Sequence, residues 1–260
     1  MNNIFCIEDI LKYAQSSDFV SNFNNTLDYL NAKNRAVFVT TSNRFQIKGK
    51  QEDIPKSTQI AHALSKRMKA EPVIIHADSL NIAMCEGNIS RMDGNSCGVK
   101  DSLLKDKEKN PSGNHRCWAS INVKDDELWK ITKPLFDSDC ILFFGSIRWG
   151  QANGLYQKII ERLSWIENIN VTLKEKNIVK GIDAGFICTG HNWRGSDVVK
   201  IQKEVLSYFG FNTPESLFWN WQWTKNSEDE DLQGYKKDAA DFKKLIKLTV
   251  KGKNIDERQE

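Results

Sequence analysis

Five short runs of apolar residues alternate along this chain with segments whose apolar residues recur at helical spacing. In the first four runs, polar and apolar residues do not alternate, so each is predicted to be a strand covered on both faces. The five predicted strands are 36–41, 73–77, 140–145, 183–189 and 215–223. Parallel strands need crossover connections, and the helices between the runs can supply them. The pattern therefore predicts an α/β fold with a parallel sheet between two layers of helices.

Three segments lie outside this alternation. Residues 1–34 have apolar residues at helical spacing and are predicted to form an N-terminal helical extension. Residues 79–124 have glycines, charges and weak periodicity, which indicates an insertion with its own role or a disordered excursion. Residues 251–260 are predicted to be a flexible charged tail. These assignments leave 35–250 as one α/β domain, which a chain of 260 residues can build around a single core.

The composition is that of an ordinary globular protein, with 40% hydrophobic and 27% charged residues and a net charge of +3. Charge alone therefore does not suggest a nucleic-acid partner. No apolar run approaches the roughly 18 residues that span a bilayer, and polar and acidic residues near the start argue against a signal peptide. Six cysteines are too few for a disulfide scaffold, and Cys140 and Cys188 lie in predicted buried strands. We therefore expect a cytoplasmic protein with no membrane or nucleic-acid partner.

In an open parallel sheet, ligands bind beyond the carboxyl ends of the strands, so the loops after the first, third and fourth strands form the candidate site. The first loop contains Thr41, Ser42 and Arg44, and the following helix starts near Ser57 and Thr58. Hydroxyl groups, a cation and a helix N-terminus favour a bound phosphate. The alternative is that Ser57 only caps the helix and that Arg44 is a surface charge. No GxGxxG motif follows the first strand, which disfavours a dinucleotide bound in the Rossmann manner.

The second and third loops combine glycines, polar residues and an aromatic residue. In 145–154 the glycines allow close backbone approach, Trp149 offers an apolar wall, and Asn153 can cap the next helix. Trp149 could instead pack against a neighbouring helix. The third loop, 189–195, could likewise be a simple turn into a helix. Because the three loops would meet in space, their similar composition favours a ligand site over three unrelated turns.

Residues in these loops resemble the flavodoxin-like NAD(P)H-dependent FMN reductases. The sequence TSNR at 41–44 resembles the family's Ser-x-Arg phosphate loop. The sequence DSDCILFFGSIRWG at 137–150 resembles the family's strand that leads into Ser-Pro-x-Tyr-x-Gly, and the next helix, NGLYQKIIERLSW, is also similar. The resemblance covers 35–250.

The resemblance implies a three-layer flavodoxin-like sandwich whose five parallel strands have the order 2-1-3-4-5, with bound FMN and with NAD(P)H as co-substrate. It puts the FMN phosphate at Ser42, Arg44, Ser57 and Thr58, the isoalloxazine ring along Ser146, Ile147, Arg148, Trp149, Gly150, Gln151 and Asn153, and the far edge of the ring at Gly190, His191 and Asn192. Thr41 and Thr189 are further candidate cofactor-binding residues. The chain departs from the family's pattern at Ile147, which replaces Pro, at Trp149, which replaces Tyr, and in the eleven residues between Arg44 and Lys56.

The implied activity is hydride transfer from NAD(P)H to the flavin and onward to a quinone, a flavin or another small acceptor. No acid or base is obligatory. Candidates for a supporting role are Arg148, which would favour the negatively charged reduced flavin, and His191, which could donate a hydrogen bond. Members of the family commonly form homodimers or homotetramers, so the same assembly is expected for this chain. Alternatives within the fold are a flavodoxin-type electron carrier and a binding module without a cofactor.

The insertion contains Cys85, Cys97, His115 and Cys117, which could form a Cys₃His zinc site or hold an iron–sulfur cluster. Neither half of this set has a CxxC motif, so we predict free thiols and no metal. We expect the insertion to fold over the flavin edge as a substrate lid or to form a subunit interface.

Overall fold

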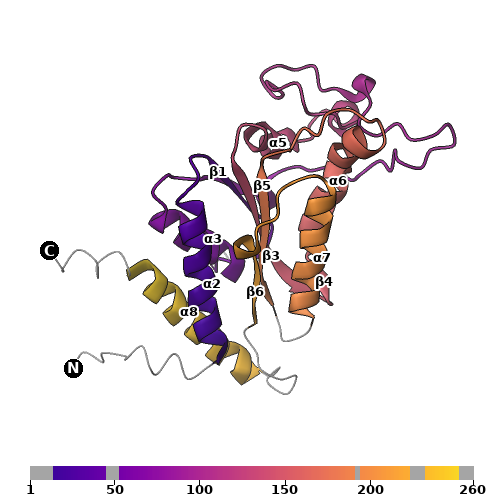
Figure 1. Cartoon of the computed structure of the whole chain (residues 1–260). Helices are drawn as coiled ribbons and strands as arrows, with labels where there is room; N and C mark the ends of the chain where they lie inside the picture. The colour runs from indigo at the N-terminus through magenta and orange to yellow at the C-terminus, as the bar shows by residue number, and fades with distance from the viewer. Residues whose placement is uncertain (1–13, 45–52, 191–193, 223–231, 252–260) are drawn as a thin grey trace, which may run out of the picture.

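The computed structural model describes residues 14–44, 53–190, 194–222 and 232–251, which form a three-layer α/β sandwich (Figure 1). The central sheet consists of β1 (Ala36–Thr40), β2 (Val73–His76), β3 (Cys140–Arg148), β4 (Gln151–Ala152), β5 (Asp183–Gly190) and β6 (Phe218–Gln222). Five of these strands are parallel in the order β2-β1-β3-β5-β6, and β4 pairs antiparallel with the end of β3. The predicted fold class and strand order are therefore confirmed, since the parallel strands follow the order 2-1-3-4-5.

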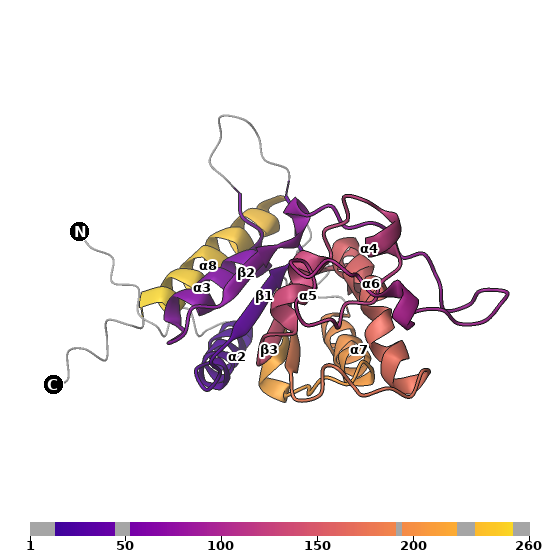
Figure 2. The same cartoon turned by 90° about the horizontal axis from the view of Figure 1, so that it is seen from above.

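Helices cover both faces of the sheet (Figure 2). On one face lie α2 (Ala14–Leu30), α3 (Lys56–Arg67) and α8 (Leu232–Lys251), and on the other lie α5 (Trp129–Leu135), α6 (Gly154–Val171) and α7 (Gly195–Tyr208). Shorter helical segments are η1 (Ala77–Ser79), η2 (Lys100–Ser102), α4 (Ala119–Asn122) and η3 (Glu215–Leu217). Among the described helices, none is both long and apolar enough to cross a membrane.

The strands in the middle of the sheet are covered on both faces, as their apolar sequences predict. Every residue of β1 and β5 is buried, and so are the residues of β3 up to Gly145. β2 differs, because Val73 is 52% exposed and His76 is also exposed. The prediction that 73–77 is a buried strand is therefore wrong in part. Val73 and His76 are exposed because β2 is the last strand on its side of the described sheet and has a neighbouring strand on one side only.

α2 packs against β6 through aromatic side chains and hydrogen bonds. The ring of Phe19 lies edge-on to those of Trp219 and Trp221, with ring centroids 5.6 and 6.1 Å apart. Beside this contact, Trp219 Nε1 donates a hydrogen bond to Thr26 Oγ1 at 2.8 Å, and Thr26 Oγ1 donates to the Ser216 carbonyl at 2.6 Å. Buried polar groups are thereby satisfied within an apolar contact, which fixes the position of α2 on the sheet.

Asp183 ties together three segments at the amino-terminal edge of the sheet. Its carboxylate accepts hydrogen bonds from Tyr29 Oη at 2.8 Å and from Asn212 Nδ2 at 3.1 Å, and it forms an ion pair with Lys33. Burial by itself would raise the pKa of the Asp183 carboxyl, but hydrogen bonds from Lys33 and the other two partners hold it below its usual value. The carboxylate is therefore ionised and joins the start of β5 to the end of α2.

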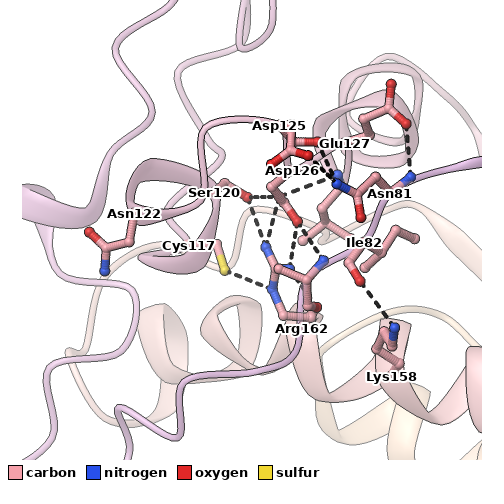
Figure 3. Close-up of polar contacts among 12 residues, drawn as sticks. Asn81, Ile82, Cys117, Ser120, Asn122, Asp125, Asp126, Glu127, Lys158 and Arg162 are labelled. Carbon is pink, nitrogen blue, oxygen red and sulfur yellow. Dashed lines mark hydrogen bonds and ion pairs between the residues drawn. The ribbon is translucent and has the colours of Figure 1, made fainter.

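The insertion 79–124 is anchored to α6 by a buried ion pair (Figure 3). Arg162 of α6 and Asp126, which follows the insertion, are joined by two hydrogen bonds of 2.7 and 2.9 Å, and both side chains are fully buried. Arg162 also donates to the Ala83 carbonyl at 2.9 Å and to Cys117 Sγ at 3.3 Å. One guanidinium group thus holds both ends of the insertion against α6.

The cysteine-bearing part of the insertion lies toward the carboxyl end of α6. A Cβ atom added at Gly98 would meet the Trp165 carbonyl oxygen at 2.9 Å, and Arg116 forms an ion pair of 2.9 Å with Glu175. Trp165 is roughly 16 Å along the helix from Gly154, where α6 begins after β4. These two contacts lie toward the far end of α6, whereas Ile82, at the start of the insertion, accepts a hydrogen bond at 3.1 Å from Lys158 near the start of α6. A lid over the flavin edge therefore stays a prediction. A subunit interface stays a prediction.

Candidate functional site

The carboxyl ends of β1, β3 and β5 lie side by side, which brings the three predicted loops together. β1 pairs with β3 in a register that puts Thr40 beside Phe144, and β3 pairs with β5 so that Ser146 lies beside Thr189. The Thr41 amide continues the first ladder by donating to the Phe144 carbonyl at 2.8 Å. In Figure 1 this edge is the lower end of the sheet, next to β4. The residues that follow these strands therefore share one edge of the sheet.

The side chain of Asn153 joins the ends of β1 and β3. Its Nδ2 donates to the Thr41 carbonyl at 2.8 Å, and its Oδ1 accepts from the Ser146 amide at 3.0 Å and lies 3.1 Å from Thr41 Oγ1. Asn153 is 7% exposed, and a Cβ atom added at Gly145 would lie 2.9 Å from Oδ1, so the amide is tightly enclosed. The prediction that Asn153 caps α6 is wrong at the level of its side chain, because the amide is turned toward β1 and forms no capping hydrogen bond.

Three hydroxyl side chains lie at the carboxyl end of β1 and the start of α3. Ser57 Oγ donates to Ser42 Oγ at 2.9 Å, and Ser42, Ser57 and Thr58 are all buried. Thr58 Oγ1 has no hydrogen-bond partner among the described residues. α3 begins at Lys56 behind Pro55, and no side chain caps its first turn. The alternative that Ser57 only caps the helix is therefore wrong. Because no side chain caps α3, the amide N–H groups of its first turn can donate to an anion.

Arg44 lies at the surface in an ion pair with Asp53. The two charged groups are 2.7 Å apart, and the side chains are 38% and 64% exposed. A pair so open to water adds little to stability. This position matches the surface-charge alternative for Arg44, and a contact between Arg44 and a phosphate stays a prediction.

Residues 145–154 contain a β-hairpin instead of an open loop. β3 and β4 pair as far as Arg148 and Gln151, which leaves Trp149 and Gly150 as a two-residue turn. Both turn residues have positive φ, 50° and 70°, as a type I′ turn requires. Trp149 is 89% exposed, so the alternative that it packs against a helix is wrong. The hairpin presents an indole ring and the exposed Arg148 at the predicted ring side of the site.

Ile147 and Ser146 have opposite roles in the hairpin. Ile147 is 8% exposed, and Cβ atoms added at Gly190 and Gly195 would lie 2.6 and 3.0 Å from its Cδ1, so the two glycines allow β5 and α7 to approach β3. Ser146 points to the other face of the strand, where its Oγ is buried without a described hydrogen-bond partner. Of these two predicted ring contacts, Ser146 has an unused hydroxyl, whereas the Ile147 side chain is enclosed by protein.

The other predicted site residues lie at the turn and at the end of β5. Gln151 is exposed in β4, and Thr189 is 6% exposed in β5, beside the hairpin. Gly190 is the last residue of β5. His191 and Asn192 lie outside the described residues, so their contacts with a flavin stay predictions.

His115 of the insertion is part of a buried hydrogen-bond network. Its Nδ1 lies 2.6 Å from Thr132 Oγ1 and its Nε2 lies 2.9 Å from Ser120 Oγ. Burial, together with a neighbouring guanidinium charge, lowers the pKa of His115 to about 4. Cys85, Cys97 and Cys117 are free thiols, and burial raises the pKa of Cys97 to about 12. Within the described ranges, no three His, Cys, Asp or Glu side chains are arranged to hold a metal ion.

Comparison with known proteins supports the fold. No family model matches the sequence, and no curated protein matches it. Among solved structures, the chain is similar to RosB with bound 8-demethyl-8-formylriboflavin-5′-phosphate, at 12% sequence identity and a TM-score of 0.51, over 83% of this chain and 75% of RosB. The chain has a flavodoxin-like fold.

Two further solved structures are similar to this flavodoxin-like chain over most of its length. One is the NADH:FMN oxidoreductase EmoB, at 13% identity and a TM-score of 0.41, over 82% of this chain and 88% of EmoB. The other is the NAD(P)H:quinone oxidoreductase from Methanothermobacter marburgensis, at 8% identity and a TM-score of 0.46, over 85% of this chain and 98% of that protein.

Two features of the site in this flavodoxin-like fold were not predicted from the sequence. One is the amide network of Asn153, whose place directly before a helix indicates a cap and says nothing about the direction of the side chain. The other is the hairpin. Its signal is weak, because Gly150 suits the second position of a type I′ turn, but Trp149 occupies the position where Asn, Asp or Gly is preferred.

Proposed function

We propose that the protein is an FMN-dependent NAD(P)H oxidoreductase that passes electrons to a quinone, a flavin or another small acceptor. The observation that carries this proposal is the hydroxyl cluster of Ser42, Ser57 and Thr58 at the uncapped start of α3. The buried Thr58 hydroxyl has no described partner, and such a group costs free energy unless a ligand or water satisfies it. The cluster lies at the carboxyl edge of the sheet, where nucleotides bind in open α/β folds.

The donors in this cluster fit the phosphate of FMN. Thr58 can donate to a phosphate oxygen without giving up another hydrogen bond, and the first turn of α3 adds amide N–H groups and the positive end of the helix dipole. Ser57 can donate to the phosphate only by giving up its hydrogen bond to Ser42, because a hydroxyl has one proton. RosB has a riboflavin 5′-phosphate derivative bound on the same fold, which supports a flavin nucleotide as the ligand.

The hairpin supplies the residues that would hold the isoalloxazine ring. Trp149 offers an exposed apolar surface, Ser146 an unused hydroxyl, and Arg148 a positive charge. FMN, when bound, supplies the capacity to take a hydride from a nicotinamide and to reduce an acceptor. The residues of the chain fix the phosphate, orient the ring, and favour negative charge near Arg148. None of the described side chains has to transfer a proton for this chemistry, and His191 stays a candidate hydrogen-bond donor.

The proposal includes small molecules as the partners, the cytoplasm as the location, and a homodimer or homotetramer as the assembly. Analytical ultracentrifugation of the purified protein measures the assembly directly. A single species with the mass of one chain at micromolar concentration would contradict this part of the proposal without touching the activity.

Cofactor content and turnover test the activity. The purified protein should show a flavin spectrum or gain one with added FMN, and denaturation should release FMN, identified by mass spectrometry. NADH or NADPH should then be oxidised in the presence of a quinone. Bound FMN that is reduced by dithionite, but not by either nicotinamide, indicates an electron carrier instead. A saturating titration without FMN binding favours a cofactor-free binding module and overturns the proposal.

A further inference from the structure

We propose that Asn153 is a positioning residue that sets the phosphate side of the flavin site and makes the protein prefer FMN to riboflavin. This inference rests on the proposed function, because it concerns the same site. For this role Asn153 does not need to touch the flavin. It acts through Thr41, the first residue of the loop after β1, which we call the phosphate-side loop.

The amide of Asn153 uses its donor and its acceptor on two different strands. Nδ2 donates to the Thr41 carbonyl at 2.8 Å, and Oδ1 accepts from the Ser146 amide at 3.0 Å. Thr41 Oγ1 lies 3.1 Å from Oδ1 and 3.0 Å from the Phe144 carbonyl, so its single proton serves one of two acceptors. One enclosed amide therefore links the carboxyl end of β1 to that of β3.

From Thr41 the contacts continue to the hydroxyl cluster. Ser42 is the next residue in the chain, and its Oγ accepts the hydrogen bond from Ser57 in α3. Thr58, with its unpartnered hydroxyl, follows Ser57 in the same helical turn. A shift of the Thr41 backbone therefore moves Ser42 relative to the start of α3. The arrangement of hydroxyl groups that would surround a phosphate depends on where Asn153 holds Thr41.

The hairpin residues 146–151, which are the predicted contacts of the flavin ring, depend less on the side-chain amide of Asn153. Around Ser146, β3 is held by its ladder with β5 and by its hairpin with β4, and the backbone N–H of Asn153 donates to the Ser146 carbonyl at 2.9 Å. These contacts use backbone atoms and remain when the side chain is changed. β1, in contrast, ends at Thr40, and beyond it the Thr41 amide adds one ladder hydrogen bond, to the Phe144 carbonyl at 2.8 Å. Substitutions at Asn153 are therefore expected to weaken phosphate contacts more than ring contacts.

Two substitutions separate the functions of the amide. Asn153→Ala removes its donor and its acceptor. Asn153→Asp keeps the size of the side chain and the acceptor for the Ser146 amide, but it removes the donor to Thr41 and adds a negative charge. That charge repels the phosphate of FMN and has no such effect on uncharged riboflavin. The matched control is Thr26→Val, because Thr26 also links two segments from a buried position, between α2 and β6.

The test is a titration of each purified apoprotein with FMN and with riboflavin, followed by quenching of flavin fluorescence. The ratio of the riboflavin Kd to the FMN Kd should fall at least about tenfold in Asn153→Ala, which corresponds to about 1.4 kcal/mol of lost preference for the phosphate. It should fall further in Asn153→Asp. The Thr26→Val control should be less stable than the wild type in urea unfolding but keep the wild-type ratio of Kd values, because a purely structural defect does not distinguish the two ligands.

The outcomes separate this inference from the proposed function. If the wild-type protein binds FMN and the ratio of the riboflavin Kd to the FMN Kd is the same in Asn153→Asp, the positioning role is overturned and the proposed function stands. A wild-type protein that binds neither ligand overturns the proposed function. If Asn153→Ala does not fold, Asn153→Ser decides, because it removes the amide donor to Thr41 without adding a charge.

Discussion

The guanidinium group of Arg162 and the carboxylate of Asp126 face each other in two hydrogen bonds, and both side chains are fully buried (Figure 3). Burial by itself would raise the pKa of Asp126, but hydrogen bonds from Arg162 and Ser120 hold it below its usual value. Both partners are therefore charged. Each charge is stabilised mainly by the other, so the removal of one leaves a buried charge without its partner.

Replacement of Arg162 by methionine is expected to lower the free energy of unfolding by about 3–5 kcal/mol, because Asp126 is then buried and unpaired. The double replacement Arg162→Met with Asp126→Leu should be more stable than Arg162→Met alone, because no charge remains buried. Urea unfolding followed by circular dichroism measures both variants. The matched control is Arg35→Met, which breaks an exposed pair with Asp137 and should cost less than about 1 kcal/mol. A double variant less stable than the single one would contradict this account.

Acid is expected to destabilise the protein through His115. Burial holds the pKa of His115 at about 4 in the folded protein, below its ordinary value of 6.5. Between these two values the unfolded chain binds a proton that the folded chain does not, so stability falls as the pH is lowered, by about 1.4 kcal/mol per pH unit. Above the ordinary pKa both states are neutral and this dependence ends. The measurement is the free energy of unfolding against pH for the wild type and for His115→Gln. The difference in the free energy of unfolding between the wild type and His115→Gln should narrow as the pH falls. Two parallel curves would show that His115 does not cause the loss of stability in acid.

Thr58→Val should separate stability from ligand binding. The Thr58 hydroxyl is buried without a described partner, so its removal should leave the stability of the apoprotein unchanged or raise it by up to about 1 kcal/mol. Affinity for FMN should fall about tenfold, because a donor to the phosphate is lost, whereas affinity for riboflavin should not change. Thr132→Val is the control, since its hydroxyl bonds to His115 at 2.6 Å and its loss should destabilise the protein without an effect on FMN. Unchanged FMN affinity in Thr58→Val would remove Thr58 from the site.

Trp149→Asn is expected to stabilise the hairpin and weaken the ring side of the site. Trp149 has a φ of 50°, a conformation that asparagine adopts at lower cost, so the apoprotein should gain up to about 1 kcal/mol. Loss of the indole surface should reduce FMN affinity about threefold to tenfold. Trp149→Phe keeps an aromatic ring in the same conformation and should retain wild-type stability and most of the affinity. Thermal unfolding and flavin titration measure the two effects, and a Trp149→Asn protein that binds FMN as tightly as the wild type would show that the indole is not in contact with the ligand.

The middle of the sheet was predictable from the sequence because its strands are buried on both faces. β1 and β5 lack polar residues at alternate positions, and this signal can be read without knowledge of the rest of the fold. The same signal overstated the burial of β2, where Val73 is half exposed. Whether a strand has a neighbour on each side depends on the order of the strands, which a local run of apolar residues does not determine.

For the candidate site, the meeting of the strand ends could be predicted from the sequence, but the side-chain contacts could not. The rule that ligands bind beyond the carboxyl ends of strands was enough to select the loop at Ser42 and the helix start at Thr58. The direction of the Asn153 side chain could not be predicted, because it depends on Thr41, which is distant in the sequence. The pair of Arg162 and Asp126 was missed for the same reason. Each residue resembles an ordinary surface charge until the fold brings the two together.

The carboxylate of Asp183 joins α2 to β5 at the end of the sheet opposite to the hairpin and the hydroxyl cluster. This contact therefore lies at the amino-terminal edge, away from the candidate site at the carboxyl edge. Substitutions in the turn after β3 leave the contacts of Asp183 unchanged, because the two lie at opposite ends of the sheet. We therefore expect the turn to tolerate changes in its side chains without loss of the contact between α2 and β5.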